Sequence, residues 1–134
     1  MEKSFRRDFA SLNDIFEFLN AFLVQKRAGE AVRYALKLAV EELFTNMVKY
    51  NTGGRDMITI RMVAVDGVLT IDLIDDDVDP FDPAKAVESG VHEAIGDRRI
   101  GGLGLRLVRS AVDKISYEYK DRRMTVTVCK ALEP

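Results

Sequence analysis

The fold of this chain follows from one stretch of its sequence, Ala39-Val-Glu-Glu-Leu-Phe-Thr-Asn-Met-Val-Lys-Tyr50. The spacing of its apolar residues predicts one amphipathic helix. Glu42 and Asn46 are four residues apart, so they share a face of this helix, and Lys49 follows one turn later. A carboxylate and an amide beside an apolar stripe suit a site where one oxygen holds a metal ion and another handles a proton. Taken alone, the pair also fits an ordinary exposed helix.

Hydrophobic periodicity predicts the elements on either side of this stretch. The helix extends back to about Glu30 and ends at Asn51-Thr-Gly-Gly54. An earlier helix, capped by Ser11 or Asn13, ends near Gly29. The other expected elements are an edge strand at Ser4 to Ala10, a hairpin of 57–65 and 68–74 around Asp66-Gly67, a helix at 105–112, and a second hairpin of 114–120 and 124–130.

The order of these elements, β-α-α-β-β-loop-α-β-β, predicts the fold class. It fits an α+β sandwich with helices on one face of a mainly antiparallel sheet. No linker or repeat interrupts the chain, so residues 1–134 are expected to form a single domain. Residues 75–100 lack periodicity and are too long for a simple connection, which indicates a lid or binding loop at about 82–100.

Composition excludes several classes of protein. The 20 basic residues balance 22 acidic ones, so a broad electrostatic footprint for nucleic acid is not expected. The longest apolar runs are too short to span a bilayer, and the N-terminal residues do not resemble a signal peptide. Cys129 is the only cysteine and has no partner for an internal disulfide. These features predict a cytoplasmic protein that does not bind membranes.

An acidic cluster, Asp75-Asp-Asp-Val-Asp-Pro-Phe-Asp-Pro83, follows the second strand of the first hairpin. Five carboxylates among eight residues repel one another unless they are solvated or matched. One of them is suited to accept a hydrogen bond from the exocyclic amine of a base. A solvated acidic turn and a cation site are the alternatives, although the spacing lacks the glycine and distal glutamate of an EF-hand.

A glycine cluster, Gly101-Gly-Leu-Gly-Leu105, precedes the third predicted helix. Glycines at a helix start let backbone N–H groups approach a phosphate, and the helix dipole favours the anion. The cluster is not a Rossmann fingerprint, because no parallel βαβ unit precedes it. It is not a P-loop either, because no Gly-Lys-Ser/Thr follows.

In their order and spacing, the three segments resemble the motifs of the Bergerat-fold ATPases, the superfamily of gyrase, Hsp90, histidine kinases and MutL. The segment from Glu42 to Tyr50 resembles their N box, Asp76 to Pro83 the first glycine box, and Ile100 to Arg109 the second. Pro80-Phe-Asp-Pro83 and the segment from Val112 to Tyr117 look most like one branch, the anti-sigma-factor serine kinases of sporulation and stress response. The resemblance covers essentially the whole chain.

The resemblance implies ATP and Mg²⁺ as ligands and a role for each matching residue. Asn46 would bind the Mg²⁺ and Glu42 would be the general base, while Thr45 and Lys49 would lie near the adenine pocket or the phosphates. Counting back from Phe81 gives Asp76 as the adenine-binding acid, with Asp75 and Asp77 as the alternatives, and puts Val78 where a glycine is expected. The full ATP-contacting set comprises Asn46, Lys49, Asp76, Val78, Phe81, Arg98, Arg99, Ile100, Gly101, Gly102, Leu103, Gly104 and Leu105, with Arg98 or Arg99 reaching the γ-phosphate.

The function implied by this resemblance is a protein serine kinase. It would phosphorylate a STAS-type anti-anti-sigma protein, bind a sigma factor, and form a homodimer as relatives do. His92, the only histidine, lies in the expected lid and not on a dimerisation helix, which weighs against an autophosphorylating histidine kinase. Because Val78 would narrow the adenine pocket, the alternative is a non-catalytic nucleotide-binding module that interacts with partners in another bacterial signalling system.

Overall fold

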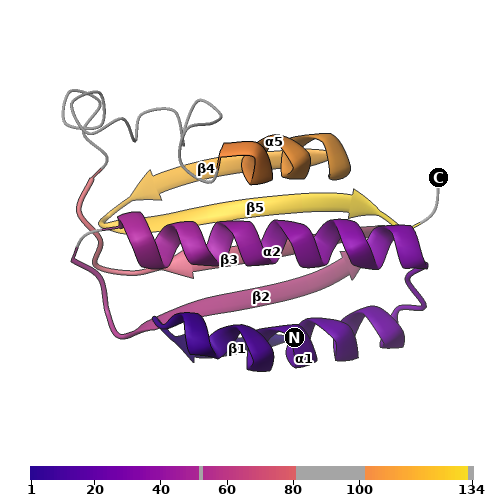
Figure 1. Ribbon diagram of the computed structural model, residues 1–134, viewed down its shortest axis with the longest axis horizontal. Helices are drawn as coiled ribbons and strands as arrows, with labels where there is room; N and C mark the ends of the chain where they lie inside the picture. Colours follow the sequence, from indigo (N-terminus) through magenta and orange to yellow (C-terminus); the bar gives the residue numbers. More distant parts are fainter. Residues whose placement is uncertain (52, 81–101, 133–134) are drawn as a thin grey trace.

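The computed structural model describes residues 1–51, 53–80 and 102–132. The helix expected around Ala39 to Tyr50 is the second half of the longest helix in this part of the chain (Figure 1). In chain order the elements are β1 (Glu2–Arg6), a 3-10 helix η1 (Phe9–Ser11), α1 (Leu12–Gln25), α2 (Glu30–Tyr50), β2 (Met57–Val65), β3 (Val68–Asp75), α5 (Gly102–Ala111), β4 (Lys114–Lys120) and β5 (Arg123–Ala131).

The strands form one five-stranded sheet in the order β1-β2-β3-β5-β4, and every described pairing is antiparallel. The β2–β3 hairpin closes at the predicted Asp66-Gly67 turn, with Val65 opposite Val68. Both turn residues have positive φ, at 51° and 78°, which is the conformation that the tightest hairpin loops require. The predicted α+β class with a mainly antiparallel sheet is therefore confirmed.

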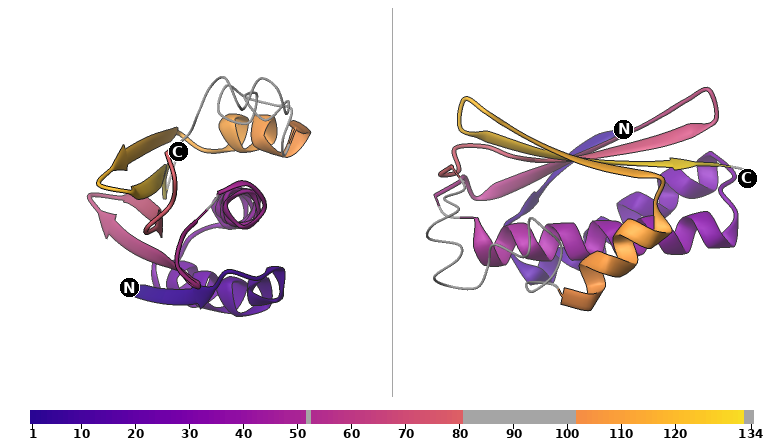
Figure 2. Two further views of the ribbon diagram at one scale, coloured as in Figure 1. Left: turned by 90° about the vertical axis from the view of Figure 1, so that its left-hand side faces the viewer. Right: turned by 90° about the horizontal axis from the view of Figure 1, so that it is seen from above.

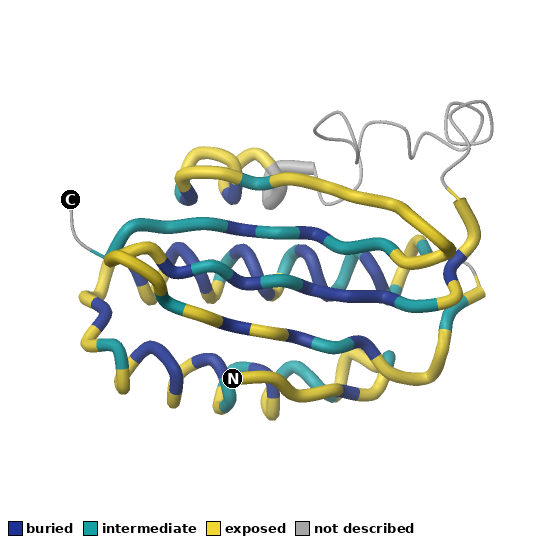
Figure 3. The backbone as a smooth tube through the Cα atoms, turned by 180° about the vertical axis from the view of Figure 1, so that it is seen from behind, coloured by how far each residue is buried: buried dark blue, intermediate teal, exposed yellow. Residues whose placement is uncertain are grey.

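The helices pack on one face of this sheet only (Figure 2). Successive side chains of a strand alternate between faces, and Leu69, Ile71 and Leu73 of β3 are fully buried in the core together with Leu36 and Phe44 of α2. No helix of the described residues covers the other face. Figure 3 shows it from that side, with buried positions concentrated in the central strands and exposed ones along β4 and β1. Among the described helices, none combines the length and apolar character needed to cross a bilayer.

Several predicted element ends, and one predicted cap, differ from the structure. The first strand ends at Arg6, because Asp8 turns the chain into η1 by accepting a hydrogen bond from the Ala10 N–H (2.9 Å). Ser11 is the residue before α1 but does not cap it, since its hydroxyl donates to the Arg6 carbonyl (2.8 Å). The helix predicted from residue 105 already begins at Gly102.

Candidate functional site

Glu42, Asn46 and Lys49 lie along one side of α2, at the border of its buried face. Their apolar neighbours Leu43, Phe44 and Met47 are buried against the sheet, whereas Glu42 and Asn46 are half-buried and Lys49 is exposed. Spacings of four and three residues put the three side chains one above another. The helix therefore presents a carboxylate, an amide and a cation in a row.

The surroundings of Glu42 favour its protonated form. Burial raises the pKa of its carboxyl group above the ordinary 4.5, and nearby Glu41 raises it further, while the positive charge of Lys49 opposes both effects. A carboxylate with a raised pKa accepts protons more readily near neutral pH, as a general base must. Glu42 thus has the electrostatic environment expected of such a base.

The Asn46 side chain leaves an acceptor unsatisfied. Its Oδ1 atom is buried and has no hydrogen-bond partner among the described residues. A buried oxygen in this state is destabilising unless a ligand or an ion engages it. An amide oxygen is a ligand that Mg²⁺ accepts. By contrast, the neighbouring Thr45 hydroxyl is satisfied within the helix, donating to the carbonyls of Glu41 (2.9 Å) and Glu42 (3.1 Å).

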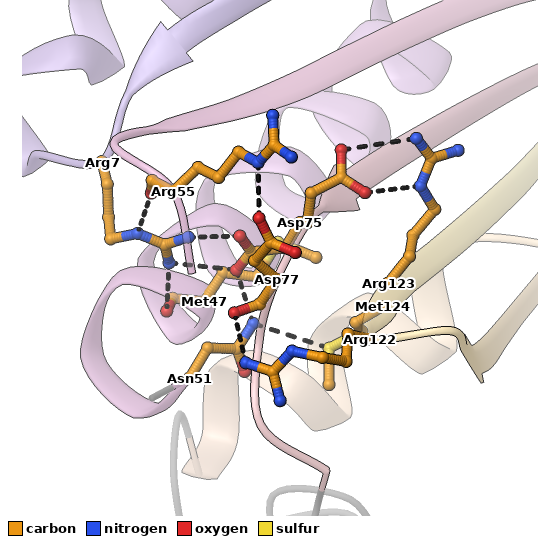
Figure 4. Close-up of polar contacts among 10 residues, drawn as sticks. Arg7, Met47, Asn51, Arg55, Asp75, Asp77, Arg122, Arg123 and Met124 are labelled. Carbon is orange, nitrogen blue, oxygen red and sulfur yellow. Dashed lines mark hydrogen bonds and ion pairs between the residues drawn. The ribbon is translucent and has the colours of Figure 1, made fainter. Parts of the chain in front are cut away.

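The four described acids of the cluster at the end of β3 each pair with an arginine (Figure 4). The repulsion among these acids is thereby relieved without a metal ion, and no group of three or more His, Cys, Asp or Glu side chains within the described ranges could hold one. The cation-site alternative for this cluster thus finds no support in the part of the chain that the structure describes. The ion pairs are Arg7 with Asp75, Arg123 with Asp76 (2.6 Å), Arg55 with Asp77 (2.6 Å) and Arg122 with Asp79 (3.3 Å).

The three consecutive acids differ in the direction they face. Asp75 follows the alternation of Leu69, Ile71 and Leu73 and is fully buried beneath the end of α2, where it accepts a hydrogen bond from Asn51 Nδ2 (2.7 Å). Asp76 pairs with Arg123 of the neighbouring strand and is about one-third exposed. Asp77 has a φ of 59°, a left-handed conformation that favours glycine. Asp75 is therefore the acid that faces the helix layer. The left-handed conformation, which suits the glycine expected two residues after the adenine-binding acid, is found two residues after Asp75, at Asp77.

Comparison with known proteins identifies the family. The histidine kinase-like ATPase domain family matches residues 5–130 of the chain, which is nearly its whole length. The chain belongs to this family. The predicted Bergerat-fold family is thereby confirmed.

Relatives agree with this assignment. The serine/threonine-protein kinase BtrW of Bordetella bronchiseptica is 24% identical over 124 residues, covering 90% of this chain and 87% of BtrW. The fold is shared with the structure of the RsbU and RsbW domains of Rv1364c from Mycobacterium tuberculosis, with a TM-score of 0.68 at 14% identity over 98% of this chain. This chain spans about a third of that protein (32%). The histidine kinase AdeS of Acinetobacter baumannii gives a TM-score of 0.57 at 14% identity, covering all of this chain and 68% of AdeS.

Several residues of the predicted ATP-contacting set lie outside the described residues or are described in part. Val78 is fully buried, and its peptide pairs with Gly53 across an isolated bridge. Gly102 and Gly104 form the first turn of α5, which packs beside α2, so the glycine cluster runs into the helix itself. Phe81, Arg98, Arg99, Ile100 and Gly101, together with His92 and the expected lid, are outside the described residues, and of Leu103 and Leu105 only the backbone is described.

Sequence reasoning missed the two residues that contact Asp75 of the acidic cluster. Arg7 lies far from it in sequence, and Asn51 was assigned only the role of ending the helix. Both donate hydrogen bonds to Asp75. The only available signal was electrostatic: five neighbouring acids need cations nearby, and several arginines of the chain were without an assigned role.

Proposed function

We propose that this chain binds Mg-ATP and transfers the γ-phosphoryl group to a serine hydroxyl of a partner protein. The observation that supports this most directly is the pair on α2. Glu42 is a carboxylate whose pKa is raised by burial, and one turn later Asn46 offers a buried oxygen that has no hydrogen-bond partner among the described residues. The same helix thus supplies a base and an oxygen ligand for a cation.

Each residue of the pair has a distinct role in this proposal. Asn46 Oδ1 would hold Mg²⁺, which characteristically takes one or two protein oxygens and completes its shell with water and phosphate oxygens. Bound ATP supplies the phosphoryl group. The Glu42 carboxylate would accept the proton of the attacking serine hydroxyl. Lys49, whose positive charge already acts on Glu42, would lie near the phosphates.

The two ends of the nucleotide would meet different segments. At the base end, the inward direction of Asp75 and the left-handed conformation of Asp77 support Asp75 as the acceptor for the adenine amine, in place of Asp76. At the phosphate end we retain Gly101, Gly102 and Gly104, because the start of α5 offers backbone N–H groups to an anion. Arg98 and Arg99 remain the proposed contacts of the γ-phosphate.

The partner we propose is a STAS-type anti-anti-sigma protein, with a sigma factor as the regulated target and a homodimer as the working form in the cytoplasm. Support comes from the relatives: BtrW is named a serine/threonine-protein kinase, and the Mycobacterium tuberculosis structure contains an RsbW domain. Sequence identity to both is low, so we propose the class of partner and do not take it over from these relatives.

Phosphorylation of a purified STAS-domain protein with γ-labelled ATP tests this function. We expect Mg²⁺-dependent incorporation at a serine that is abolished in Glu42→Gln. Glu41→Gln is the matched control, because Glu41 is an exposed neighbour on the same helix. Equal loss of transfer in both variants would contradict the assignment of the base.

A non-catalytic nucleotide-binding module is the second candidate. Asp77 and Val78 occupy the positions where the first glycine box is expected to have glycine, and Val78 is fully buried. ATP-dependent binding of a partner without phosphoryl transfer, unchanged by Glu42→Gln, would support this candidate instead.

A further inference from the structure

The Arg7 side chain reaches across three segments of the fold. It leaves the end of β1 and enters the interior, where both terminal nitrogens bond the Asp75 carboxylate and Nη1 lies 3.0 Å from Oδ2. Its Nε donates to the Arg55 carbonyl (3.0 Å), and Nη1 also approaches the Met47 carbonyl (3.4 Å). Figure 4 shows the guanidinium between the end of α2 and the end of β3.

The surroundings of Arg7 are shaped to admit the guanidinium. Gly54 has a φ of 84°, and a Cβ atom there would collide with the Arg7 guanidinium. Asp75 is the only charged side chain that is fully buried among the described residues. A buried carboxylate needs this kind of partner, and a planar guanidinium can bond both of its oxygens at once.

The contacts of Arg7 join the two halves of the proposed site. Met47 directly follows Asn46, so the Met47 carbonyl belongs to the same helical turn as the unpartnered oxygen. Asn51, one turn later, donates to the same Asp75 oxygen that Nη1 contacts. Arg7 therefore touches both the turn that carries Asn46 and the strand end that carries the acidic motif.

We propose that Arg7 is a positioning residue for the nucleotide site, holding the turn of α2 that carries Asn46 against the end of β3 that carries Asp75. This inference rests on the proposed function. A general stabilising role would lower only the free energy of unfolding. The positioning role also predicts that the Asn46 side chain moves when the bidentate contact is lost. Partners that orient a ligating side chain characteristically affect metal affinity by about 10- to 100-fold.

The test compares Arg7→Lys with Arg61→Lys. Lysine keeps the charge but cannot form the two-nitrogen contact. Arg61 pairs with Asp72 (2.9 Å) on the helix-free face of the sheet, so it is a second arginine–aspartate pair, more exposed than Arg7–Asp75 and away from the site. We expect Arg7→Lys to weaken Mg-ATP binding about 10- to 100-fold by calorimetry and to shift the Asn46 side-chain amide resonances. Arg61→Lys should do neither.

A second variant separates positioning from folding. In Arg7→Gly, low millimolar guanidinium should partly restore Mg-ATP affinity, whereas ammonium at the same concentration should not, because only guanidinium can bond both carboxylate oxygens. Unchanged Asn46 resonances in Arg7→Lys would overturn the positioning role, whether or not ATP binds. Failure of the parent chain to bind ATP would instead contradict the proposed function, and the Asn46 resonances would still decide the role of Arg7.

Discussion

Glu42 and Asn46 lie one turn apart on α2, and each is unfavourably placed for stability. Glu42 carries a charge that burial disfavours, and Asn46 holds a buried oxygen that no described residue satisfies. Such local conflicts are commonly retained where activity needs them. The sequence spacing predicted only that the two residues share a face of the helix. The structure adds the raised pKa of Glu42 and the unsatisfied oxygen of Asn46.

The raised pKa of Glu42 makes phosphoryl transfer sensitive to acid. The carboxylate takes up its proton at a higher pH than a free glutamate, so the base is lost as the pH falls through a value above 4.5. Lys49 lowers this pKa, so we expect Lys49→Met to move the acid limb of the pH–rate profile to higher pH. Lys37→Met, on the same helix, is the control. A limb that stays in place or moves down would refute this electrostatic account.

The Asn46 Oδ1 atom, which no described residue satisfies, predicts opposite effects on stability and binding. In Asn46→Leu, removal of a buried unsatisfied acceptor should raise the free energy of unfolding by about 1 kcal/mol. The same change should eliminate Mg²⁺-dependent ATP binding. Urea denaturation and calorimetry measure the two effects, and a destabilised variant that still binds Mg-ATP would contradict both expectations.

At the scale of elements, the end of β3 decides which acid faces the helices. Strand alternation continues through Asp75, and Asp77 then adopts a left-handed conformation. The Asp77 carbonyl accepts hydrogen bonds from the Gly54 N–H (2.6 Å) and from the Arg122 side chain (2.9 Å). A one-residue difference in register moves a side chain to the opposite face of a sheet. Counting back from Phe81 cannot detect such a difference, because it assumes the loop length of the family motif.

This register predicts a difference between two neighbouring variants. Asp76→Asn should leave ATP affinity within about twofold, because its charge-assisted contact to Arg123 is exposed and weak. Asp75→Asn should weaken ATP binding far more. Calorimetry on both variants, with urea denaturation to verify folding, decides between them. Loss of binding in Asp76→Asn but not in Asp75→Asn would instead identify Asp76 as the adenine-binding acid, as counting back from Phe81 predicts.

At the scale of the whole molecule, the proposed site joins elements that are distant in sequence. The end of α2 and the start of α5 lie on the helix side of the sheet, and the end of β3 belongs to the sheet itself. Arg7 connects β1 to the ends of α2 and β3. A ligand that spans such segments binds the folded state and not the unfolded chain, so its binding energy adds to stability. The homodimer remains a prediction, and sedimentation analysis would measure it.

Mg-ATP should therefore stabilise the entire fold. At a ligand concentration 100 times the Kd, we expect the free energy of unfolding to rise by about 2.7 kcal/mol. Removal of Mg²⁺ with EDTA should abolish most of this gain, as should Asn46→Ala. Thermal unfolding with and without nucleotide measures the effect. An equal stabilisation of Asn46→Ala by Mg-ATP would show that Asn46 does not hold the metal ion.

The sequence by itself determined the elements and the fold class, because hydrophobic periodicity and turn residues are local. It predicted α2 as residues 30–50, β2 as 57–65 and β4 as 114–120, each with the bounds observed, and it singled out Glu42 and Asn46. Only the tertiary structure decided which acid faces inward and that Arg7 pairs with it. These outcomes depend on strand register and on contacts between residues far apart in the chain, which no local pattern encodes.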